Sequence, residues 1–254
     1  MARPRFIVLR AAGTNCENET AWALESGGAA AEILHLGRLL AEPAALTRAQ
    51  GLVIPGGFSY GDDIAAGRIL ANRLRTGLGE ELTGLVARGG LVLGICNGFQ
   101  VLVKAGLLPG RYQPRLVQEV SLTWNDCNQY VCRWTRLACQ ESRCLFLPPA
   151  GTLLELPVAH AEGKLILDRP GAEKELDREG LVALRYVAPD GTLPAPRPWN
   201  PNGSTADIAG LTDPTGRVLG LMPHPERAML PWHHPAGRGG CGMEIFRRMA
   251  ALLA

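Results

Sequence analysis

A cysteine between glycines carries the clearest chemical signal in the chain. Cys96 follows the apolar run Leu91–Ile95, and Gly94 and Gly98 lie two residues away on either side. A reactive side chain at a sharp strand-to-helix corner needs such small neighbours, because β-carbons there would collide. The N-terminus of the helix that follows would favour the thiolate. The pattern therefore predicts a nucleophile, although a lone cysteine after a strand is more often part of a core.

A histidine and a glutamate two residues apart could supply the base. Pro225 separates His224 from Glu226, and Pro223 precedes them. Each proline fixes its own φ and biases the residue before it towards extended geometry. On extended backbone both side chains project to one side, so that Glu226 can orient the imidazole that acts on a nucleophile. The alternative is a proline-rich surface loop in which both side chains are merely solvated.

A second pair, His160 and Glu162, has the same spacing. Either pair could supply a base and its orienting group by spacing alone. Ala161-Glu162-Gly163 indicates a looser turn without prolines to set the backbone. We therefore assign the base to His224.

Paired glycines after a third apolar run could help to stabilise a reaction intermediate. Attack of a thiolate on a carbonyl creates an oxyanion, which needs backbone N–H groups about 3 Å away. Gly56 and Gly57 allow such a close approach, and we expect the N–H groups of Gly57 and Asn97 to form this hole. A simple strand-ending turn would have the same sequence. Asp62 and Asp63, which follow, are expected to cap the next helix.

These candidates are placed by a predicted α/β fold. Short apolar strands alternate with helices through the first hundred residues, which favours a doubly wound, mostly parallel sheet with helices on both faces. Ligands bind such sheets outside the carboxyl ends of the strands, where both the glycine pair and Cys96 lie. The predicted strands are Arg5–Leu9, Ala30–Leu36, Gly51–Pro55 and Leu91–Ile95, and the predicted helices are Glu17–Ser26 and a long helix that ends near Ala87.

From about residue 111 to 221 the predicted strands have no full helices between them. Loops rich in Pro and Gly join them, which predicts an antiparallel extension of the same sheet within one domain, residues 1–254. Asp213–Gly216 is a predicted turn before the strand Arg217–Met222, and Cys241–Leu253 is a predicted closing helix. The other predicted strands are Val120–Trp124, Gln129–Leu137, Thr152–His160 and Leu181–Val187.

Composition limits the possible partners. Charged residues make up 20% of the chain and the net charge is +2, without a long basic run, so we expect no nucleic-acid or membrane partner. We see no signal peptide and no apolar stretch of spanning length, and therefore expect a cytoplasmic protein with reduced thiols. The spacing of the clustered cysteines fits no zinc pattern, so we expect no metal and no disulfide. These cysteines are Cys127, Cys132, Cys139 and Cys144.

The segment around Cys96 resembles the nucleophile motif of triad-type, class I glutamine amidotransferases. Over residues 6–250 the chain is similar, more narrowly, to the glutaminase subunits of phosphoribosylformylglycinamidine synthase. The specific markers are G-G-F-S-Y-G-D from Gly56 and N-P-N-G-S from Asn200. The supporting segments are Gly13–Glu17, Ala159–Gly163, Leu181–Val187 and Met222–Arg227.

This resemblance implies a flavodoxin-like fold with an antiparallel extension, and it implies a reaction. Cys96 would attack the side-chain amide of L-glutamine. His224 would protonate the leaving ammonia and later activate water, while Glu226 orients it. Gln100 would help to complete the glutamine pocket.

The resemblance also implies partners. Ammonia would pass to a large synthetase subunit, together with which a small bridging subunit is expected. ATP and Mg²⁺ would be used by that synthetase to make formylglycinamidine ribonucleotide, so we expect no cofactor in this chain. Phe58, Tyr60 and Asp62 would lie on a loop that the partner orders, and His160 and Glu162 at a neighbouring site or partner interface.

Two alternatives remain at this point. A peptidase or hydrolase of the DJ-1/PfpI type would keep Cys96 but would need no glutamine pocket. An inactive regulatory subunit would lack the nucleophile or the base, and the sequence contains both.

Overall fold

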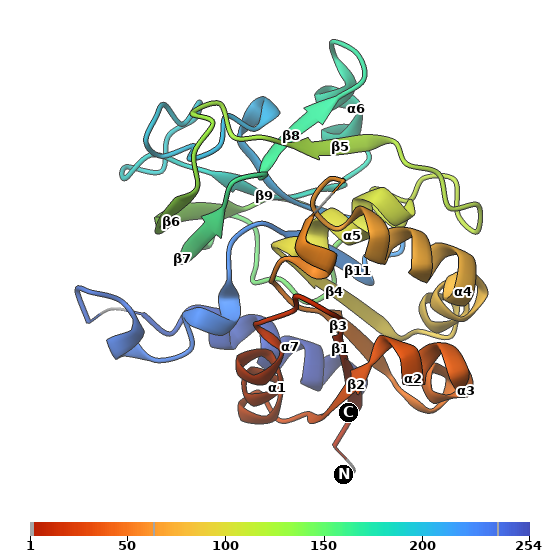
Figure 1. Ribbon diagram of the computed structural model, residues 1–254. Helices are drawn as coiled ribbons and strands as arrows, with labels where there is room; N and C mark the ends of the chain where they lie inside the picture. Colours follow the sequence, from red (N-terminus) through yellow and green to blue (C-terminus); the bar gives the residue numbers. More distant parts are fainter. Residues whose placement is uncertain (1–2, 63, 238) are drawn as a thin grey trace.

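A nine-stranded sheet runs through the computed structural model, which describes residues 3–62, 64–237 and 239–254 (Figure 1). Its first half is parallel, in the order β2-β1-β3-β4-β11. The apolar runs of β3 and β4 are buried along their whole length, as expected for a parallel sheet covered on both faces. The four predicted parallel strands are confirmed, and a strand expected in the antiparallel extension, β11, is parallel to β4 instead. The parallel strands are β1 (Arg5–Arg10), β2 (Ala30–His35), β3 (Gly51–Ile54), β4 (Leu91–Ile95) and β11 (Val218–Leu221).

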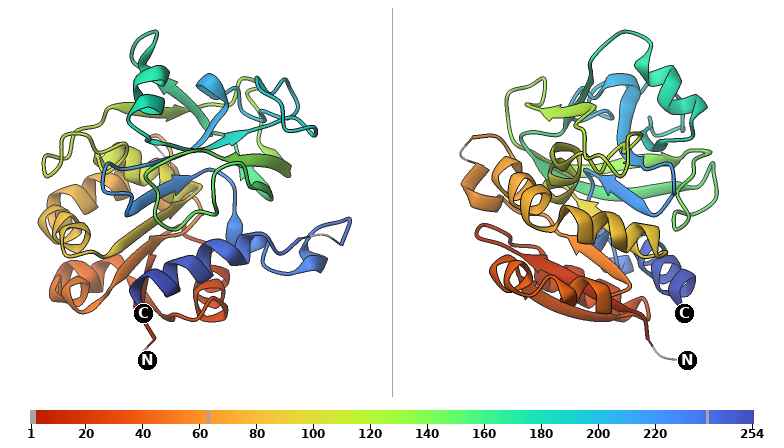
Figure 2. Two further views of the ribbon diagram at one scale, coloured as in Figure 1. Left: turned by 180° about the vertical axis from the view of Figure 1, so that it is seen from behind. Right: turned by 90° about the vertical axis from the view of Figure 1, so that its right-hand side faces the viewer.

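Helices cover both faces of this parallel half (Figures 1 and 2). The helix α1 packs against α7 on one face, and α4 packs against α5 on the other. Leu70, Leu74, Leu78 and Leu82 recur every four residues of α4 and form its buried side. The predicted doubly wound architecture is confirmed. The helices are α1 (Glu17–Ser26), α2 (Leu36–Ala41), α3 (Ala44–Arg48), α4 (Arg68–Ala87), α5 (Asn97–Ala105), α6 (Ala172–Arg178) and α7 (Gly242–Leu253).

The sheet continues beyond β11 as an antiparallel half, which confirms the predicted extension. Figure 2 shows the green and cyan part of the chain, which forms most of this half, on one side of the red-to-yellow part. The order is β10-β9-β6-β7, and all the pairs are antiparallel. That residues 1–254 form one domain stays a prediction. The antiparallel strands are β6 (Val131–Cys139), β7 (Leu153–His160), β9 (Val182–Tyr186) and β10 (Ile208–Thr212).

One expected member of this extension is wrong. The segment predicted as Val120–Trp124 forms β5 (Val120–Thr123), which pairs with β8 (Lys164–Leu167) in a separate two-stranded sheet. Val120 and Leu122 are buried and alternate with the partly exposed Ser121 and Thr123. This pattern indicates a half-buried strand but does not specify its partner. Here β5 packs beside α5 instead of joining the main sheet. The sequence did not predict β8, α6 or the short helices α2 and α3.

The register of the parallel strands brings three chain segments to one edge. Ile54 at the end of β3 is level with Gly94, and Leu221 at the end of β11 is level with Ile95. The segments that follow these strands therefore emerge side by side. Within the described part of the chain, no helix is both long and apolar enough to span a membrane.

Candidate active site

Cys96 lies at a sharp corner between β4 and α5. Its backbone has φ 52° and ψ −106°, a conformation that residues with a side chain rarely adopt. A β-carbon at Gly94 would lie 2.6 Å from the Gly98 carbonyl oxygen, and one at Gly98 would collide with the carbonyl of Ile54. The predicted elbow is therefore confirmed, together with the reason for its glycines.

The surroundings of the Cys96 thiol combine burial with a helix N-terminus. Cys96 is the N-cap residue of α5, so the positive end of that helix lies at the sulfur. The Cys96 N–H donates to the Leu221 carbonyl at 2.8 Å, which ties the elbow to the end of β11. The Sγ atom lies 3.6 Å from the carbonyl oxygen of Ala159.

His224 and Glu226 form the predicted pair. His224 Nδ1 is 2.6 Å from Glu226 Oε1, and both side chains are buried. The backbone is extended at His224 only, because Pro225–Arg227 forms a 3₁₀ turn. The prediction of extended backbone through Glu226 is therefore wrong. Proline suits the first position of a helical turn, and this turn brings the carboxylate back to the imidazole.

The charge of this pair depends on its buried environment. Burial disfavours a charged imidazole, but the carboxylate of Glu226 and the neighbouring Cys96 outweigh it and raise the pKa of His224 well above its usual value. The charge of Cys96 thus acts on His224, as expected for a nucleophile and its base. His224 Nε2 has no hydrogen-bond partner among the described residues, which leaves this atom for reacting groups.

The glycine pair after β3 is constrained by close neighbours. Gly57 has φ 148°, and a β-carbon there would lie 2.7 Å from the Gly13 carbonyl oxygen. A β-carbon at Gly56 would lie 2.7 Å from His224 Cε1. The loop is joined to the elbow because the Ser59 N–H donates to the Asn97 side chain at 3.1 Å. The oxyanion-binding role of Gly57 and Asn97 stays a prediction.

A cavity of about 250 Å³ opens beside Cys96. It brings together many of the predicted site residues, whereas Tyr60 lies outside, where its hydroxyl accepts a 2.8 Å hydrogen bond from Arg73. The residues that line the cavity are Gly57, Phe58, Gly61, Asp62, Ala66, Cys96, Gln100, Trp124, Ala159, His160, Ala161 and Glu162.

A polar network supports the floor of this cavity. The Asn97 amide donates to Gln100 Oε1 at 2.9 Å, and the Gln100 amide donates to the Glu162 carbonyl oxygen. Asp62 accepts from the Gly67 N–H at 3.1 Å and from the Asn97 amide at 3.3 Å, and burial raises its pKa.

The expected capping of the next helix by Asp62 is wrong. The helix α4 begins at Arg68, and Gly67 is its N-cap residue. The Asp62 carboxylate accepts from the N–H of Gly67 and also fixes the loop to the elbow through Asn97. Asp63 lies outside the described residues.

His160 lines the cavity but has a different partner from His224. The Asn125 amide nitrogen donates to two carbonyls, those of His160 at 2.9 Å and Gln129 at 3.1 Å. Its Oδ1 accepts from the Gly163 N–H at 3.0 Å, so the same oxygen must accept from His160 Nδ1 at 3.1 Å. Burial, followed by the charge on His224, lowers the pKa of His160 to about 3. His160 is therefore neutral, with its proton on Nδ1.

Sequence reasoning missed two residues beside the proposed catalytic base, Cys16 and Arg227. Cys16 is buried, and the ligand atoms of Cys16, His224 and Glu226 lie within 4.8 Å of one another. These atoms could hold a metal ion, but Arg227 donates to Cys16 Sγ at 2.9 Å, and this cation opposes a second one. The string G-T-N-C-E contains Cys16, but nothing in it indicates contact with a segment more than two hundred residues away.

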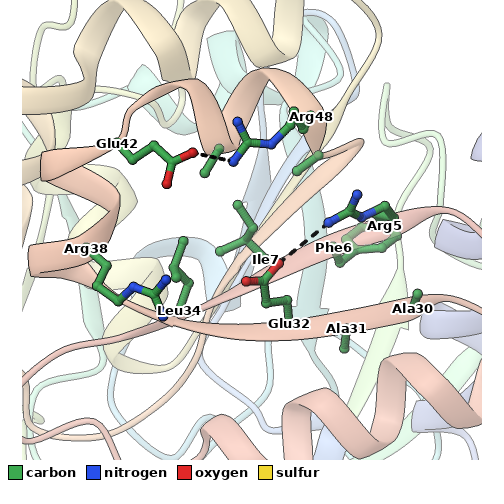
Figure 3. Close-up of a pocket in the computed structure, with 12 residues that line it drawn as sticks. Arg5, Phe6, Ile7, Ala30, Ala31, Glu32, Leu34, Arg38, Glu42 and Arg48 are labelled. Carbon is green, nitrogen blue, oxygen red and sulfur yellow. Dashed lines mark hydrogen bonds and ion pairs between the residues drawn. The ribbon is translucent and has the colours of Figure 1, made fainter.

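A second cavity, of about 300 Å³, lies between the start of β1 and β2 and the helices α2 and α3 (Figure 3). Four of its charged side chains form two ion pairs: Arg48 lies 2.6 Å from Glu42, and Arg5 lies 3.7 Å from Glu32. Its lining contains no cysteine and no histidine. We therefore place the chemistry at Cys96.

Comparison with known proteins identifies the family of the chain. The profile of the CobB/CobQ-like glutamine amidotransferase domain matches residues 3–251. The subunit PurQ of phosphoribosylformylglycinamidine synthase from Dehalococcoides mccartyi is 44% identical over 253 residues, which cover 97% of this chain and 96% of that protein. The PurQ subunit from Archaeoglobus fulgidus is 39% identical over 263 residues, which cover 98% and 97%.

Solved structures give the same result. A chain in the structure of PurLQS from Thermotoga maritima matches with a TM-score of 0.75 at 28% identity, covering 99% of this chain and 100% of that chain. A glutamine amidotransferase from Methylobacillus flagellatus matches with a TM-score of 0.57 at 16% identity, covering 100% and 96%, and shows the shared fold alone. The chain belongs to the CobB/CobQ-like glutamine amidotransferases and, within them, to the PurQ subunits of phosphoribosylformylglycinamidine synthase.

Proposed function

We propose that this chain is the glutaminase subunit of phosphoribosylformylglycinamidine synthase and that Cys96, His224 and Glu226 are its catalytic triad. The observation that carries the proposal is the elbow cysteine, which lines a cavity of about 250 Å³ and has a buried His–Glu pair acting on it. A nucleophile, a base and a group that orients the base are the parts that amide hydrolysis through a covalent intermediate requires.

In the proposed reaction the Cys96 thiolate attacks the side-chain carbonyl carbon of glutamine. The oxyanion that forms is stabilised by the N–H groups of Gly57 and Asn97. His224 gives its proton to the amide nitrogen, the carbon–nitrogen bond breaks, and ammonia leaves a thioester on Cys96. His224 then removes a proton from water, which attacks the thioester and releases glutamate and the thiol.

The lining of the cavity supports recognition of a small polar substrate. Gln100 and Asp62 are held by hydrogen bonds to Asn97, so they can present fixed polar groups to glutamine. His160 is neutral, and its Nε2 is buried without a partner among the described residues. An acceptor of this kind suits an N–H donor, and glutamine offers donors at its ammonium and amide groups.

Ammonia then passes to a synthetase subunit, as the PurLQS assembly of the relative suggests. That partner would use ATP and Mg²⁺ to convert formylglycinamide ribonucleotide to its amidine in purine biosynthesis, with a small bridging subunit in the complex. Phe58 is 45% exposed at the cavity, and its ring lies 6.4 Å from that of exposed Tyr130. We propose that this aromatic pair, with the loop that carries Tyr60, faces the partner.

The proposal is tested by removing the nucleophile. In the assembled synthase, Cys96→Ala should abolish amidine synthesis from glutamine, while synthesis from added ammonium salt remains, because free ammonia bypasses the thioester. Cys132→Ala, at an exposed cysteine on β6, is the matched control and should leave both activities unchanged. Equal loss of both activities in a correctly assembled Cys96→Ala complex would contradict the assignment.

A further inference from the structure

A second polar layer lies behind the proposed catalytic base. Cys16 is in the turn between β1 and α1, with only 1% of its surface exposed. Its Sγ accepts a hydrogen bond from Arg227 Nη2 at 2.9 Å, and its own thiol lies 3.1 Å from Asn15 Oδ1. A β-carbon at Gly56 would lie 3.1 Å from this sulfur, which therefore packs directly against the glycine pair. Cys16 thus joins the turn of the base to the loop of the proposed oxyanion hole.

Arg227 connects this layer to the carboxylate of the triad. Its Nε lies 3.9 Å from Glu226 Oε1, and its Nη2 lies 3.7 Å from Glu19 Oε1 on α1. The same Glu226 oxygen is 2.6 Å from His224 Nδ1. One carboxylate oxygen is therefore shared between an imidazole and a guanidinium.

This sharing has an electrostatic consequence. Glu226 is 1% exposed, so its negative charge acts on His224 with little screening by water. A guanidinium on the same carboxylate partly neutralises that charge, and it also repels a protonated imidazole. Arg227 is 37% exposed, which moderates the effect without removing it.

Cys16 can anchor the guanidinium without competing as a nucleophile. Burial raises the pKa of the Cys16 thiol above its usual value, so the sulfur remains protonated near neutral pH. A neutral thiol adds no charge next to Glu226. Cys16 therefore acts through position alone.

Resting on the proposed function, we infer that Arg227, anchored by Cys16 and Glu19, is a positioning residue that fixes the Glu226 carboxylate and limits how tightly His224 holds its proton. Neither Arg227 nor Cys16 is among the residues that line the cavity beside Cys96. A base that holds its proton too tightly leaves less neutral imidazole to activate water in the hydrolysis of the thioester.

Several other titratable groups, on the elements packed around His224, also act on its charge. The described neighbours that act on its charge, besides Arg227, are Glu226 on its own turn, Cys96 at the elbow, Cys16 before α1, His160 at the end of β7 and Tyr130 before β6. The variants below leave all of them in place except Cys16, which is changed in one variant.

The test compares Arg227→Gln with Arg227→Lys in the assembled synthase, by following glutamine hydrolysis between pH 6 and 10. Arg227→Gln should lower kcat about tenfold and leave KM within about twofold, because positioning acts on the chemical steps. The acidic limb of the pH profile should move upward by about half a pH unit, because the loss of a nearby cation raises the pKa of the imidazole that must be neutral to activate water. Arg227→Lys keeps the charge and should restore the pH profile.

Two further variants keep the test decisive. Cys16→Ala removes the anchor and should give a smaller loss of kcat, about threefold, with part of the pH shift. Arg247→Gln, at an exposed arginine on α7, is the control and should behave as the unaltered protein. Synthesis from ammonium salt reports correct folding and assembly of each variant.

The possible outcomes separate this inference from the proposed function. An unshifted pH profile in Arg227→Gln, or identical profiles for Arg227→Gln and Arg227→Lys, would overturn the role of the charge. Unaltered kinetics in Cys16→Ala would overturn the anchor. The proposed triad fails instead if His224→Asn retains glutamine hydrolysis.

Discussion

The two His-x-Glu segments have the same spacing and opposite properties. In one, His224 Nδ1 faces the Glu226 carboxylate at 2.6 Å, and the pKa of the imidazole is raised. In the other, His160 Nδ1 faces the Asn125 amide oxygen at 3.1 Å, and the pKa is lowered to about 3. Both histidines are buried, so burial does not explain the difference. The partner of Nδ1 decides which histidine carries a proton.

The backbone explains why Glu162 does not contact His160 as Glu226 contacts His224. Pro225 begins a 3₁₀ turn that returns Glu226 to the imidazole. After β7 no proline sets such a turn, and Glu162 Oε2 accepts instead from the Ala66 N–H at 3.3 Å. Spacing in a sequence therefore does not by itself establish a pair.

The largest expected effect comes from replacing His224, and the same replacement of His160 provides the comparison. His224→Asn should reduce glutamine hydrolysis by about a thousandfold or more, because the general base and acid is lost, while synthesis from ammonium salt survives. His160→Asn should reduce hydrolysis by tenfold at most, mainly through KM, because it removes an acceptor from the cavity. The reverse ranking would assign the triad to Cys96, His160 and Glu162. The measurement is steady-state ammonia release by the assembled synthase.

A smaller change makes the environment of His224 resemble that of His160. Glu226→Gln replaces the carboxylate by an amide and should reduce kcat about a hundredfold, because the imidazole loses its orienting charge. The carboxylate raises the pKa of His224, so its removal should lower that pKa and move the acidic limb of the pH profile downward. Glu162→Gln is the matched control and should leave the pH profile unchanged. A profile that moves equally in both variants would contradict the comparison.

The smallest effect is on stability in acid. Between pH 6.5 and about 3, the unfolded chain binds a proton at His160 that the folded chain does not, so stability falls as pH decreases. The slope is about 1.4 kcal/mol per pH unit over this range. The raised pKa of His224 acts in the opposite sense, since its contribution is present at low pH and is lost as pH rises through the folded-state value.

His160→Gln should therefore flatten the acid side of the stability curve. The free energy of unfolding, measured by urea denaturation between pH 4.5 and 6.5, should fall less steeply for this variant than for the unaltered chain. His233→Gln, on the turn Pro231–His233, provides the control. Parallel curves for all three proteins would show that His160 is not held neutral by the fold.

The features that the sequence predicts well are local ones. The elbow at Cys96 requires glycines two residues away, and the strands that position it are continuous apolar runs. The features that the sequence does not predict are contacts between distant segments of the chain. Arg227 meets Cys16 across 211 positions of the chain, and the Asn125 amide holds His160 across 35. The pairing of β5 with β8 has the same character, because alternation gives a strand one apolar side but does not select its neighbour.

The pairing of β4 with β11 also bears on how this enzyme can be altered. These strands are parallel neighbours, and the Cys96 N–H is bonded to the Leu221 carbonyl, so nucleophile and base share one rigid hydrogen-bonded unit. The chain from residue 97 to residue 217 leaves this unit and returns to it. Insertions or sequence exchange within its exposed loops, such as residues 189–194, should leave the catalytic geometry intact. Such loops are therefore suitable sites for adding purification tags or fluorescent reporters to a working enzyme.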